Sequence, residues 1–330
     1  MENGVLEMYI HENRIQLVGE MYQYVHKLVD ISIQNNWKII IWGFGRGGRL
    51  LRHLIQDVDT RTQVAYIIDE YMRIPYDFQP AVYHSSLLEY IDASEYMVLS
   101  CVKNMEENQE KLIGFTEGEN LFDVEKEIGN SYVEFLERRN NRVNFSSTLK
   151  KNMEKDYGKD CIDHIPFAYS CVDNVFDEIL HLDKEIKFFD YGCGKGAALL
   201  MAYMSGIRKI GGVEIVNSIY QQAAINMQEL HIECDLRNQD ATECNIDKYN
   251  VFFFYNPFQG KLFEKVIRNI QESYKYNKRN IYLIYGNPFC HQIVIKDGFF
   301  KLYKQIRTDL YDPLLNIYKI DNEKGIINEL

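Results

Sequence analysis

The sequence predicts an α/β protein made of two open sheets, one after the other along its 330 residues. Two glycine-rich loops indicate this, because each directly follows a short apolar run typical of a buried strand. The first loop, at 43–48, follows the run Lys38–Trp42, and the second, at 192–196, follows an apolar run that ends at Phe189. The length also suits two domains of ~150 residues each.

The second glycine loop carries the strongest functional signal. Residues 188–196 read Phe-Phe-Asp-Tyr-Gly-Cys-Gly-Lys-Gly, with glycine at 192, 194 and 196. Glycine lets the backbone pass close to a ligand, and a helix that starts at the end of such a loop presents free N–H groups to an anionic group. Asp190 stands where the predicted strand ends, which is where open α/β sheets bind ligands.

The residues downstream repeat the expected alternation of helix and strand. An apolar helix at Ala197–Met204 leads to a second strand at 209–215, with Glu214 near its end, eighteen residues after Gly196. An acid at this point of a βαβ unit accepts hydrogen bonds from ribose hydroxyls. After a helix at 218–230 and a strand near 231–237, a strand at 249–255 runs directly into Asn-Pro-Phe at 256–258.

These motifs, in this order and spacing, resemble those of class I S-adenosylmethionine-dependent methyltransferases over residues 160–330. The resemblance implies a seven-stranded, mostly parallel sheet that ends in an antiparallel hairpin, expected here at 299–307 and 314–320. It also implies that S-adenosylmethionine is the cofactor. The implied cofactor contacts are Asp190, Gly192, Cys193, Gly194 and Gly196 under its amino-acid part, Glu214 at the ribose, Asp240 and Ala241 at the adenine, and Phe167 and Tyr169 as a lid.

The triplet Asn256, Pro257 and Phe258 matches the family motif that orients the methyl acceptor, with one proline where the amino-group methylators have two. Methyl transfer is an in-line displacement on an activated donor, so the protein mainly has to align the nucleophile. The carboxamide of Asn256 and the backbone carbonyl beside Pro257 are able to accept N–H bonds from an amine. Phe258 offers an apolar wall for stacking. The single proline leaves both amine and hydroxyl acceptors open.

The first loop is a Gly-x-Gly-x-x-Gly fingerprint made by Gly43, Gly45 and Gly48, and Asp69 follows twenty-one residues after Gly48 at the end of another apolar run. This pattern is typical of dinucleotide sites, with the acid at a ribose. Residues 1–140 resemble the Rossmann-like domains of many sugar-modifying proteins, yet contain no Tyr-x-x-x-Lys pair for hydride transfer. A nucleotide site and a unit used only for packing or dimerisation both fit.

We therefore expect a first domain at 1–140, which opens with an amphipathic helix at 14–33, a linker at 141–160 where charged residues and asparagine dominate, and a methyltransferase domain at 161–330. A second Asn-Pro-Phe at 287–289 reads as a structural turn. The neighbouring His291, and His164 ahead of the first strand of the methyltransferase domain, read as packing or surface residues, although His291 is also a candidate general base for a hydroxyl acceptor.

Net charge is −11, and residues 1–140 carry most of it, with 13 Lys and Arg against 23 Asp and Glu; residues 141–330 hold 24 against 25. An acidic chain without a basic stripe is a poor candidate for phosphate-backbone binding. We therefore expect a small-molecule acceptor, such as a sugar or nucleotide-sugar, and no nucleic acid. A protein side chain is the second choice, and a binding protein without catalysis is the competing class.

The seven cysteines lack Cys-x-x-Cys pairs and zinc spacing, so we expect no metal site and a reducing cytoplasm. No apolar run is long enough to span a bilayer, and no signal peptide is visible, so we expect no membrane association.

Overall fold

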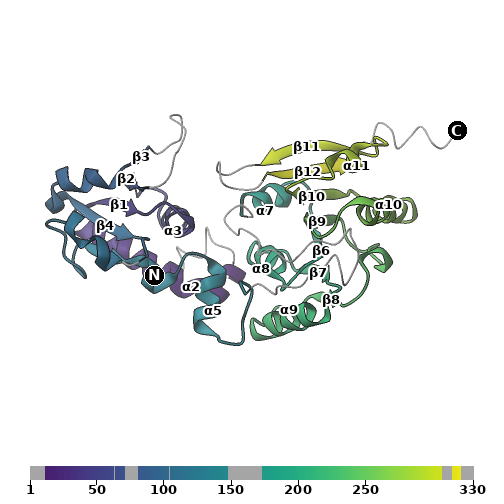
Figure 1. Cartoon of the computed structure of the whole chain (residues 1–330), viewed down its shortest axis with the longest axis horizontal. Coiled ribbons are helices and arrows are strands. Elements are labelled where there is room, and N and C mark those ends of the chain that lie inside the picture. Colours follow the sequence, from purple (N-terminus) through teal and green to yellow (C-terminus); the bar gives the residue numbers. More distant parts are fainter. Residues whose placement is uncertain are drawn as a thin grey trace. The chain divides into compact units, whose positions relative to one another are not determined.

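The computed structural model describes residues 12–62, 64–70, 81–103, 105–147, 173–306 and 314–320. It divides into two compact units, Met1–Arg139 and Asn140–Leu330, which are described one at a time. Each unit holds its own sheet, and Figure 1 shows both (Figure 1). The predicted α/β class with two Rossmann-like sheets is confirmed.

The first unit is built on a five-stranded parallel sheet with the order β3-β2-β1-β4-β5. Its strands are β1 (Lys38–Trp42), β2 (Val64–Ile68), β3 (Val82–Tyr83), β4 (Tyr96–Ser100) and β5 (Leu121–Asp123). Its helices are α2 (Glu12–Gln34), α3 (Arg46–Val58), α4 (Val124–Ile128) and α5 (Tyr132–Arg139), with short 3₁₀ turns at Ser85–Tyr90, Ala93–Glu95 and Met105–Lys111. The central strand β1 is buried from Ile39 onward, as expected for a parallel sheet covered on both faces.

The second unit is built on a seven-stranded sheet with the order β11-β12-β10-β9-β6-β7-β8. Its strands are β6 (Lys187–Tyr191), β7 (Lys209–Val213), β8 (Asp235–Arg237), β9 (Val251–Tyr255), β10 (Tyr282–Gly286), β11 (Phe300–Ile306) and β12 (Leu315–Ile320). Only β12 runs against its neighbours, and it pairs with both β10 and β11. The predicted terminal antiparallel hairpin is therefore confirmed within one residue at each end.

The helices of the second unit are α7 (Asp173–Leu180), α8 (Ala197–Met204), α9 (Asn217–Glu229), α10 (Gly260–Tyr276) and α11 (His291–Ile295), with a 3₁₀ turn at Ala241–Glu243. Helix α10 is amphipathic: it buries Phe263, Val266, Ile267 and Ile270, which lie three and four residues apart on one face. Helix α8 has no polar face, because seven of its eight residues are buried. It is therefore a core helix, and it begins directly at the glycine loop.

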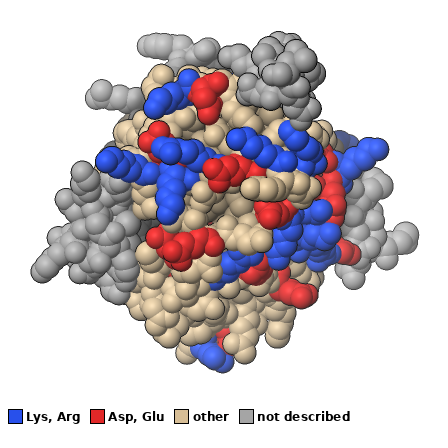
Figure 2. All heavy atoms as spheres, turned by 90° about the vertical axis from the view of Figure 1, so that its right-hand side faces the viewer, with Lys and Arg blue, Asp and Glu red and all other residues tan. Residues whose placement is uncertain are grey.

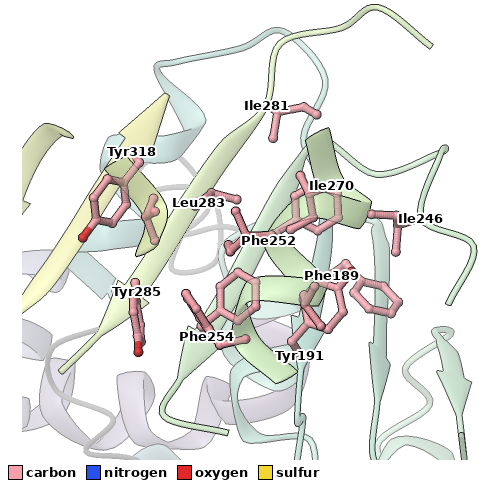
Figure 3. Packing of buried hydrophobic residues seen from close by; sticks show 14 of the residues in the cluster. Phe189, Tyr191, Ile246, Phe252, Phe254, Ile270, Ile281, Leu283, Tyr285 and Tyr318 are labelled. Atoms are coloured by element: carbon pink, nitrogen blue, oxygen red, sulfur yellow. The ribbon is translucent and has the colours of Figure 1, made fainter. Parts of the chain in front are cut away.

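Aromatic side chains hold the centre of the second sheet together (Figure 3). Strand β9 reads Val-Phe-Phe-Phe-Tyr, a continuous apolar run typical of a strand covered on both faces. The ring of Phe254 stacks on Tyr191 with centroids 4.9 Å apart and an interplanar angle of 7°. Because Tyr191 is the last residue of β6, this packing fixes the point from which the glycine loop departs.

Candidate cofactor and acceptor site

The second sheet has its topological switch point between the parallel neighbours β6 and β9. From β6 the chain adds β7 and β8 toward one edge of the sheet, and from β9 it adds β10 and β12 toward the other. Crevices of this kind, outside the carboxyl ends of the strands, are where open α/β sheets bind ligands. The glycine loop follows β6, Glu214 follows β7, and Asn256 follows β9. The structure therefore brings the three motifs of the sequence to one edge of the sheet.

The glycine loop needs its glycines for two different reasons. Gly192, Gly194 and Gly196 have φ values of 73°, 56° and 88°, a left-handed region that side chains disfavour. A Cβ atom on Gly192 would in addition lie 2.3 Å from Cβ of Pro257. The loop after β6 thus lies directly against the loop after β9, and no larger residue at 192 fits between them.

Glu214 ties the end of β7 to the glycine loop. Its buried carboxylate accepts the backbone N–H of Gly194 at 3.2 Å through one oxygen and that of Val216 at 2.8 Å through the other. Burial raises the pKa of this carboxyl, and the backbone donors act in the opposite direction. Each carboxylate oxygen can accept more than one hydrogen bond, so ribose hydroxyls remain possible partners.

Asp190 is buried beside this group at the end of β6. Burial, and secondarily the negative charge of Glu214, raise the pKa of Asp190 well above its usual range. Two acidic groups buried together disfavour a second negative charge and favour a cationic ligand next to them. S-adenosylmethionine carries a sulfonium and an ammonium group, so this pair of carboxyls fits its amino-acid end.

Cys193 is also buried in the loop, and a Cβ atom on Gly212 of β7 would lie 2.8 Å from Cβ of Cys193. Burial raises the pKa of the Cys193 thiol well above its usual value. The side chain is therefore a small apolar packing group, which the glycine in β7 accommodates.

Asp240 and Ala241 lie just beyond β8. The carboxylate of Asp240 accepts the backbone N–H of Thr242 at 2.7 Å and so caps the short turn Ala241–Glu243. Ala241 packs against the hydrophobic core of the sheet. Both residues are half-buried at the same end of the strands as Glu214, and their contact with adenine stays a prediction.

Asn256 differs from its counterpart on the next strand. Asn256 and Asn287 follow the parallel neighbours β9 and β10 and both have left-handed φ, at 49° and 48°. The carboxamide of Asn287 donates to the hydroxyl of Tyr255 at 3.4 Å. Within the part of the chain that the structure describes, the half-buried carboxamide of Asn256 has no such hydrogen bond. It is held in a strained backbone conformation with its polar atoms available.

The phenylalanines of the two Asn-Pro-Phe triplets also differ. Phe258 is 5% exposed and packs edge-on against Tyr191 and Phe254, with centroids 6.4 Å apart in both cases. Phe289 is 82% exposed. The ring of Phe258 thus packs in the core of the sheet, and the acceptor role of Asn256, Pro257 and Phe258 stays a prediction.

The order of strands, with one antiparallel strand next to the edge and the glycine loop after β6, a neighbour of the central strand β9, decides the fold of this unit. The second unit has the class I methyltransferase fold. No protein-family model and no curated protein sequence matches the chain.

Solved methyltransferases share parts of this fold. An RNA methyltransferase from Salinibacter ruber, in complex with S-adenosyl-L-homocysteine, is 18% identical, covers 44% of this chain and 90% of its own, and has a TM-score of 0.32. The ribosomal protein L11 methylase of Lactobacillus delbrueckii subsp. bulgaricus is 12% identical, with 45% and 75% covered and a TM-score of 0.36. The tRNA (uracil-54, C5)-methyltransferase of Pyrococcus abyssi is 13% identical, with 46% and 38% covered and a TM-score of 0.38.

These findings correct one prediction. The expected small-molecule acceptor without nucleic acid is wrong, since methyltransferases of RNA, tRNA and ribosomal protein are among the similar structures. The prediction rested on the acidic net charge and the lack of a basic stripe in the sequence, although residues 141–330 hold 24 Lys and Arg against 25 Asp and Glu. The face in Figure 2 carries Lys and Arg side chains interspersed with Asp and Glu (Figure 2).

His291 is hydrogen-bonded to the neighbouring part of the sheet. The ring Nδ1 of His291 lies 2.8 Å from the hydroxyl of Tyr318, so this histidine is held by β12 of the methyltransferase unit. His164, Phe167 and Tyr169, the last two predicted as lid residues, lie outside the described residues.

Among the described residues there is no His, Cys, Asp and Glu cluster suited to a metal ion. Of the described helices, none is long and apolar enough to cross a bilayer.

The loop of the first unit resembles the methyltransferase loop in position, because it follows β1 between β2 and β4. A Cβ atom on Gly48 would lie 2.1 Å from the carbonyl oxygen of Gly43, whereas one on Gly45 would meet no atom within 4 Å. The carboxylate of Asp69 accepts the backbone N–H of Phe44 at 2.6 Å. Gly43 and Gly48 thus serve packing, while the space at Gly45 is open.

Two side chains at the glycine loop, Lys195 and Asn226, were not among the candidates that the sequence predicted. Lys195 stands inside the loop itself and is 3% exposed, and Asn226 on α9 is fully buried. A lysine between two glycines was a visible signal, but its partners come from residues 144–147, which sequence pattern alone assigned to a linker.

Proposed function

We propose that the chain transfers a methyl group from S-adenosylmethionine to an amine nitrogen or a hydroxyl oxygen. The observation that carries this proposal is the direct contact between Gly192 of the glycine loop and Pro257 of the acceptor motif. A loop that binds the donor and a loop that orients the acceptor must lie side by side for an in-line displacement.

The residues of the glycine loop fit the donor. The left-handed glycines remove side chains from the path of the ligand, and the buried pair Asp190 and Glu214 favours its cationic end. When bound, S-adenosylmethionine supplies a methyl group on a positively charged sulfur, which is already a good leaving group. The protein therefore needs no metal ion or strong acid to activate it.

The acceptor is oriented by Asn256. Its carboxamide oxygen accepts an N–H or O–H from the nucleophile, which leaves the lone pair of the attacking atom directed at the methyl carbon. When bound, S-adenosylmethionine would supply the methyl group and keep the electron pair of the carbon–sulfur bond on its sulfur. The proton of the attacking N–H or O–H would pass to water, while the carbonyl oxygens of the Asn256-Pro257 loop accept hydrogen bonds from the acceptor.

A cofactor-binding protein without catalysis is the alternative from a different class. A left-handed asparagine with an available carboxamide favours catalysis, because binding the donor alone does not require that strain. Calorimetric titration of the full chain with S-adenosylmethionine, and separately with NAD(H), separates a methyl-donor site from a nicotinamide site. Incubation with methyl-labelled donor and fractionated RNA, protein and small molecules then identifies the acceptor by where the label appears.

Asn256→Ala should bind S-adenosylmethionine with nearly unchanged affinity but lose most turnover, because Asn256 contacts the acceptor and not the donor. The measurement is label transfer to the identified acceptor, with donor affinity from calorimetry. Asn287→Ala is the matched control, since it removes the same side chain from the same backbone conformation one strand away. Full activity of Asn256→Ala would contradict the acceptor role.

A second candidate function concerns the first unit, where we propose a nucleotide site at the loop 43–48. The open space at Gly45 and the uncapped start of α3 at Arg46 leave room for a phosphate at the helix end. Asp69 stands at the end of β2, where a ribose would lie. A thermal-shift screen of the full chain against nucleotides and nucleotide-sugars tests this, and the absence of any shift across the panel would leave the unit with a packing role alone.

A further inference from the structure

We propose that residues 140–147 form a strap that holds the glycine loop of the cofactor site in shape, with Asn226 and Lys195 as the positioning residues that fasten it. This inference deepens the proposed function and rests on it for the identity of the cofactor. The strap begins directly after the last residue of the first unit, Arg139, and its described part ends at Ser147. It lies within the second unit.

Asn226 connects the strap to the loop through both ends of its carboxamide. Its Nδ2 donates to the backbone carbonyl of Lys195 at 2.9 Å and to that of Asn144 at 3.0 Å. Its Oδ1 accepts the backbone N–H of Asn144 at 2.8 Å and the side chain of Gln222 at 2.9 Å. A fully buried amide with four partners is expensive to disturb, because each partner would be left without a hydrogen bond.

Lys195 makes the second connection, from the loop to the strap. Its ammonium group donates to Oδ1 of Asn144 at 3.0 Å and to the carbonyl of Ser147 at 2.6 Å, and the hydroxyl of Ser147 is a further partner. The side chain is thus held by oxygen atoms of the strap. We infer that it acts on the cofactor through the loop and not by contact.

The strap is itself anchored along its length. Val143 and Phe145 are buried, and Arg142 forms an ion pair with Glu229 at 2.6 Å, while Asn140 donates to the same carboxylate at 3.0 Å. Because α9 supplies Gln222, Asn226 and Glu229, the strap runs along that helix before it reaches the loop. A segment fixed at both ends of its course is suited to hold the loop 192–196, because three of its five residues are glycines without a side chain that could make such contacts.

The reason this matters is entropic. Glycine loses more conformational freedom on ordering than any other residue. A loop with three glycines therefore lowers the affinity for its ligand if it becomes ordered only on binding. Fastening Lys195, the residue between Gly194 and Gly196, restricts the loop at its centre before the ligand arrives. The strap therefore raises affinity without touching the ligand.

The test compares Asn226→Ala with Asn250→Ala in the full chain. Asn250 is a matched control: its buried carboxamide also joins backbone groups, accepting the N–H of Lys187 at 2.7 Å and donating to the carbonyl of Glu185 at 2.8 Å. It does so at the start of β6, the end opposite the glycine loop. Both variants should melt earlier, but only Asn226→Ala should weaken S-adenosylmethionine binding, by about tenfold or more.

Hydrogen exchange provides the second readout, which does not depend on the cofactor. Backbone amides of 192–196 should exchange faster in Asn226→Ala and in Lys195→Met, and at the wild-type rate in Asn250→Ala. If these amides exchange at the wild-type rate in both Asn226→Ala and Lys195→Met, the proposal that the strap orders the loop is wrong. If the wild-type chain binds no S-adenosylmethionine, the proposed function fails, and the exchange rates still decide whether the strap orders the loop.

Discussion

At the scale of single residues, Glu214 has a structural role in addition to the ribose contact that the sequence predicts. The position after β7 predicted a ribose contact, and the structure adds two hydrogen bonds from backbone N–H groups on either side of the site. The second role was not predictable, because it depends on the path of the glycine loop. Burial raises the pKa of the Glu214 carboxyl, and it also keeps water from competing for the oxygen atoms that a ligand would contact.

Glu214→Ala should therefore weaken S-adenosylmethionine binding by more than the tenfold expected from the ribose bonds alone, and should lower the melting temperature as well. Charge-assisted hydrogen bonds contribute roughly 1.5–3 kcal/mol each, and tenfold in affinity corresponds to about 1.4 kcal/mol. Glu214→Gln keeps one acceptor oxygen and the shape, so it should fall between alanine and wild type. Wild-type affinity in a normally folded Glu214→Ala would remove this residue from the site.

Asp190 predicts a pH dependence. A carboxyl whose pKa is raised in the folded chain binds its proton more tightly there than when unfolded, so the free energy of unfolding falls as pH rises from the usual value of about 4 toward the raised value. A cationic ligand favours the ionised form, so S-adenosylmethionine should bind more tightly as pH rises from the usual value of a carboxyl toward the raised pKa, with release of a proton.

Calorimetry in two buffers of different ionisation enthalpy measures that proton directly. Asp190→Asn should show a smaller pH dependence and weaker binding at the upper end of the range. Identical binding enthalpies in both buffers, with an affinity that does not change with pH, would show that the carboxyl does not titrate on binding.

At the scale of elements, the two glycine loops of this chain look alike in sequence but are built differently. In the loop after β6, the glycine at 192 is required by a left-handed φ and by Pro257. In the loop after β1, Gly48 is required by the carbonyl of Gly43, whereas Gly45 has an ordinary φ of −67° and open surroundings. Spacing alone does not reveal which glycines serve packing, because their neighbours come from distant strands.

Three alanine substitutions should separate these roles. Gly192→Ala and Gly48→Ala each place a Cβ within 2.3 Å of another atom, so both should lower the melting temperature clearly. Gly192→Ala should in addition reduce donor binding. Gly45→Ala should leave the melting temperature unchanged or slightly higher, since alanine restricts the unfolded chain. A strongly destabilised Gly45→Ala would contradict the open space around Gly45, where a Cβ atom meets no other atom within 4 Å.

At the scale of the whole molecule, both sheets and the order of motifs could be predicted from the sequence, because apolar runs and glycine loops are local signals. Strand bounds were predicted within a few residues, the largest shift being at the start of β8, which begins at Asp235 and not near 231. The burial of Phe258 and the packing of residues 140–147 on α9 were not predictable, since both depend on contacts between residues more than 80 positions apart or on the aromatic core. The acceptor class was wrongly deduced from net charge.

Gly45→Val tests the independence of the two loops, which belong to different compact units. The valine fills the open space of the first loop, so any nucleotide-induced thermal shift should disappear. Affinity for S-adenosylmethionine, measured on the same sample by calorimetry, should stay within about twofold of wild type. A large loss of donor affinity would show that the first loop contributes to the methyltransferase site.

The asparagines at the ends of β9 and β10 are each followed by proline. Asparagine deamidates when the backbone nitrogen of the next residue attacks its carboxamide and loses its hydrogen. Proline has no hydrogen on that nitrogen, so the reaction cannot proceed in this way. The left-handed turn that presents Asn256 is thus closed by a residue that blocks its spontaneous deamidation. The carboxamide on which turnover is proposed to depend should, like that of Asn287, outlast the asparagines that are not followed by proline during prolonged storage.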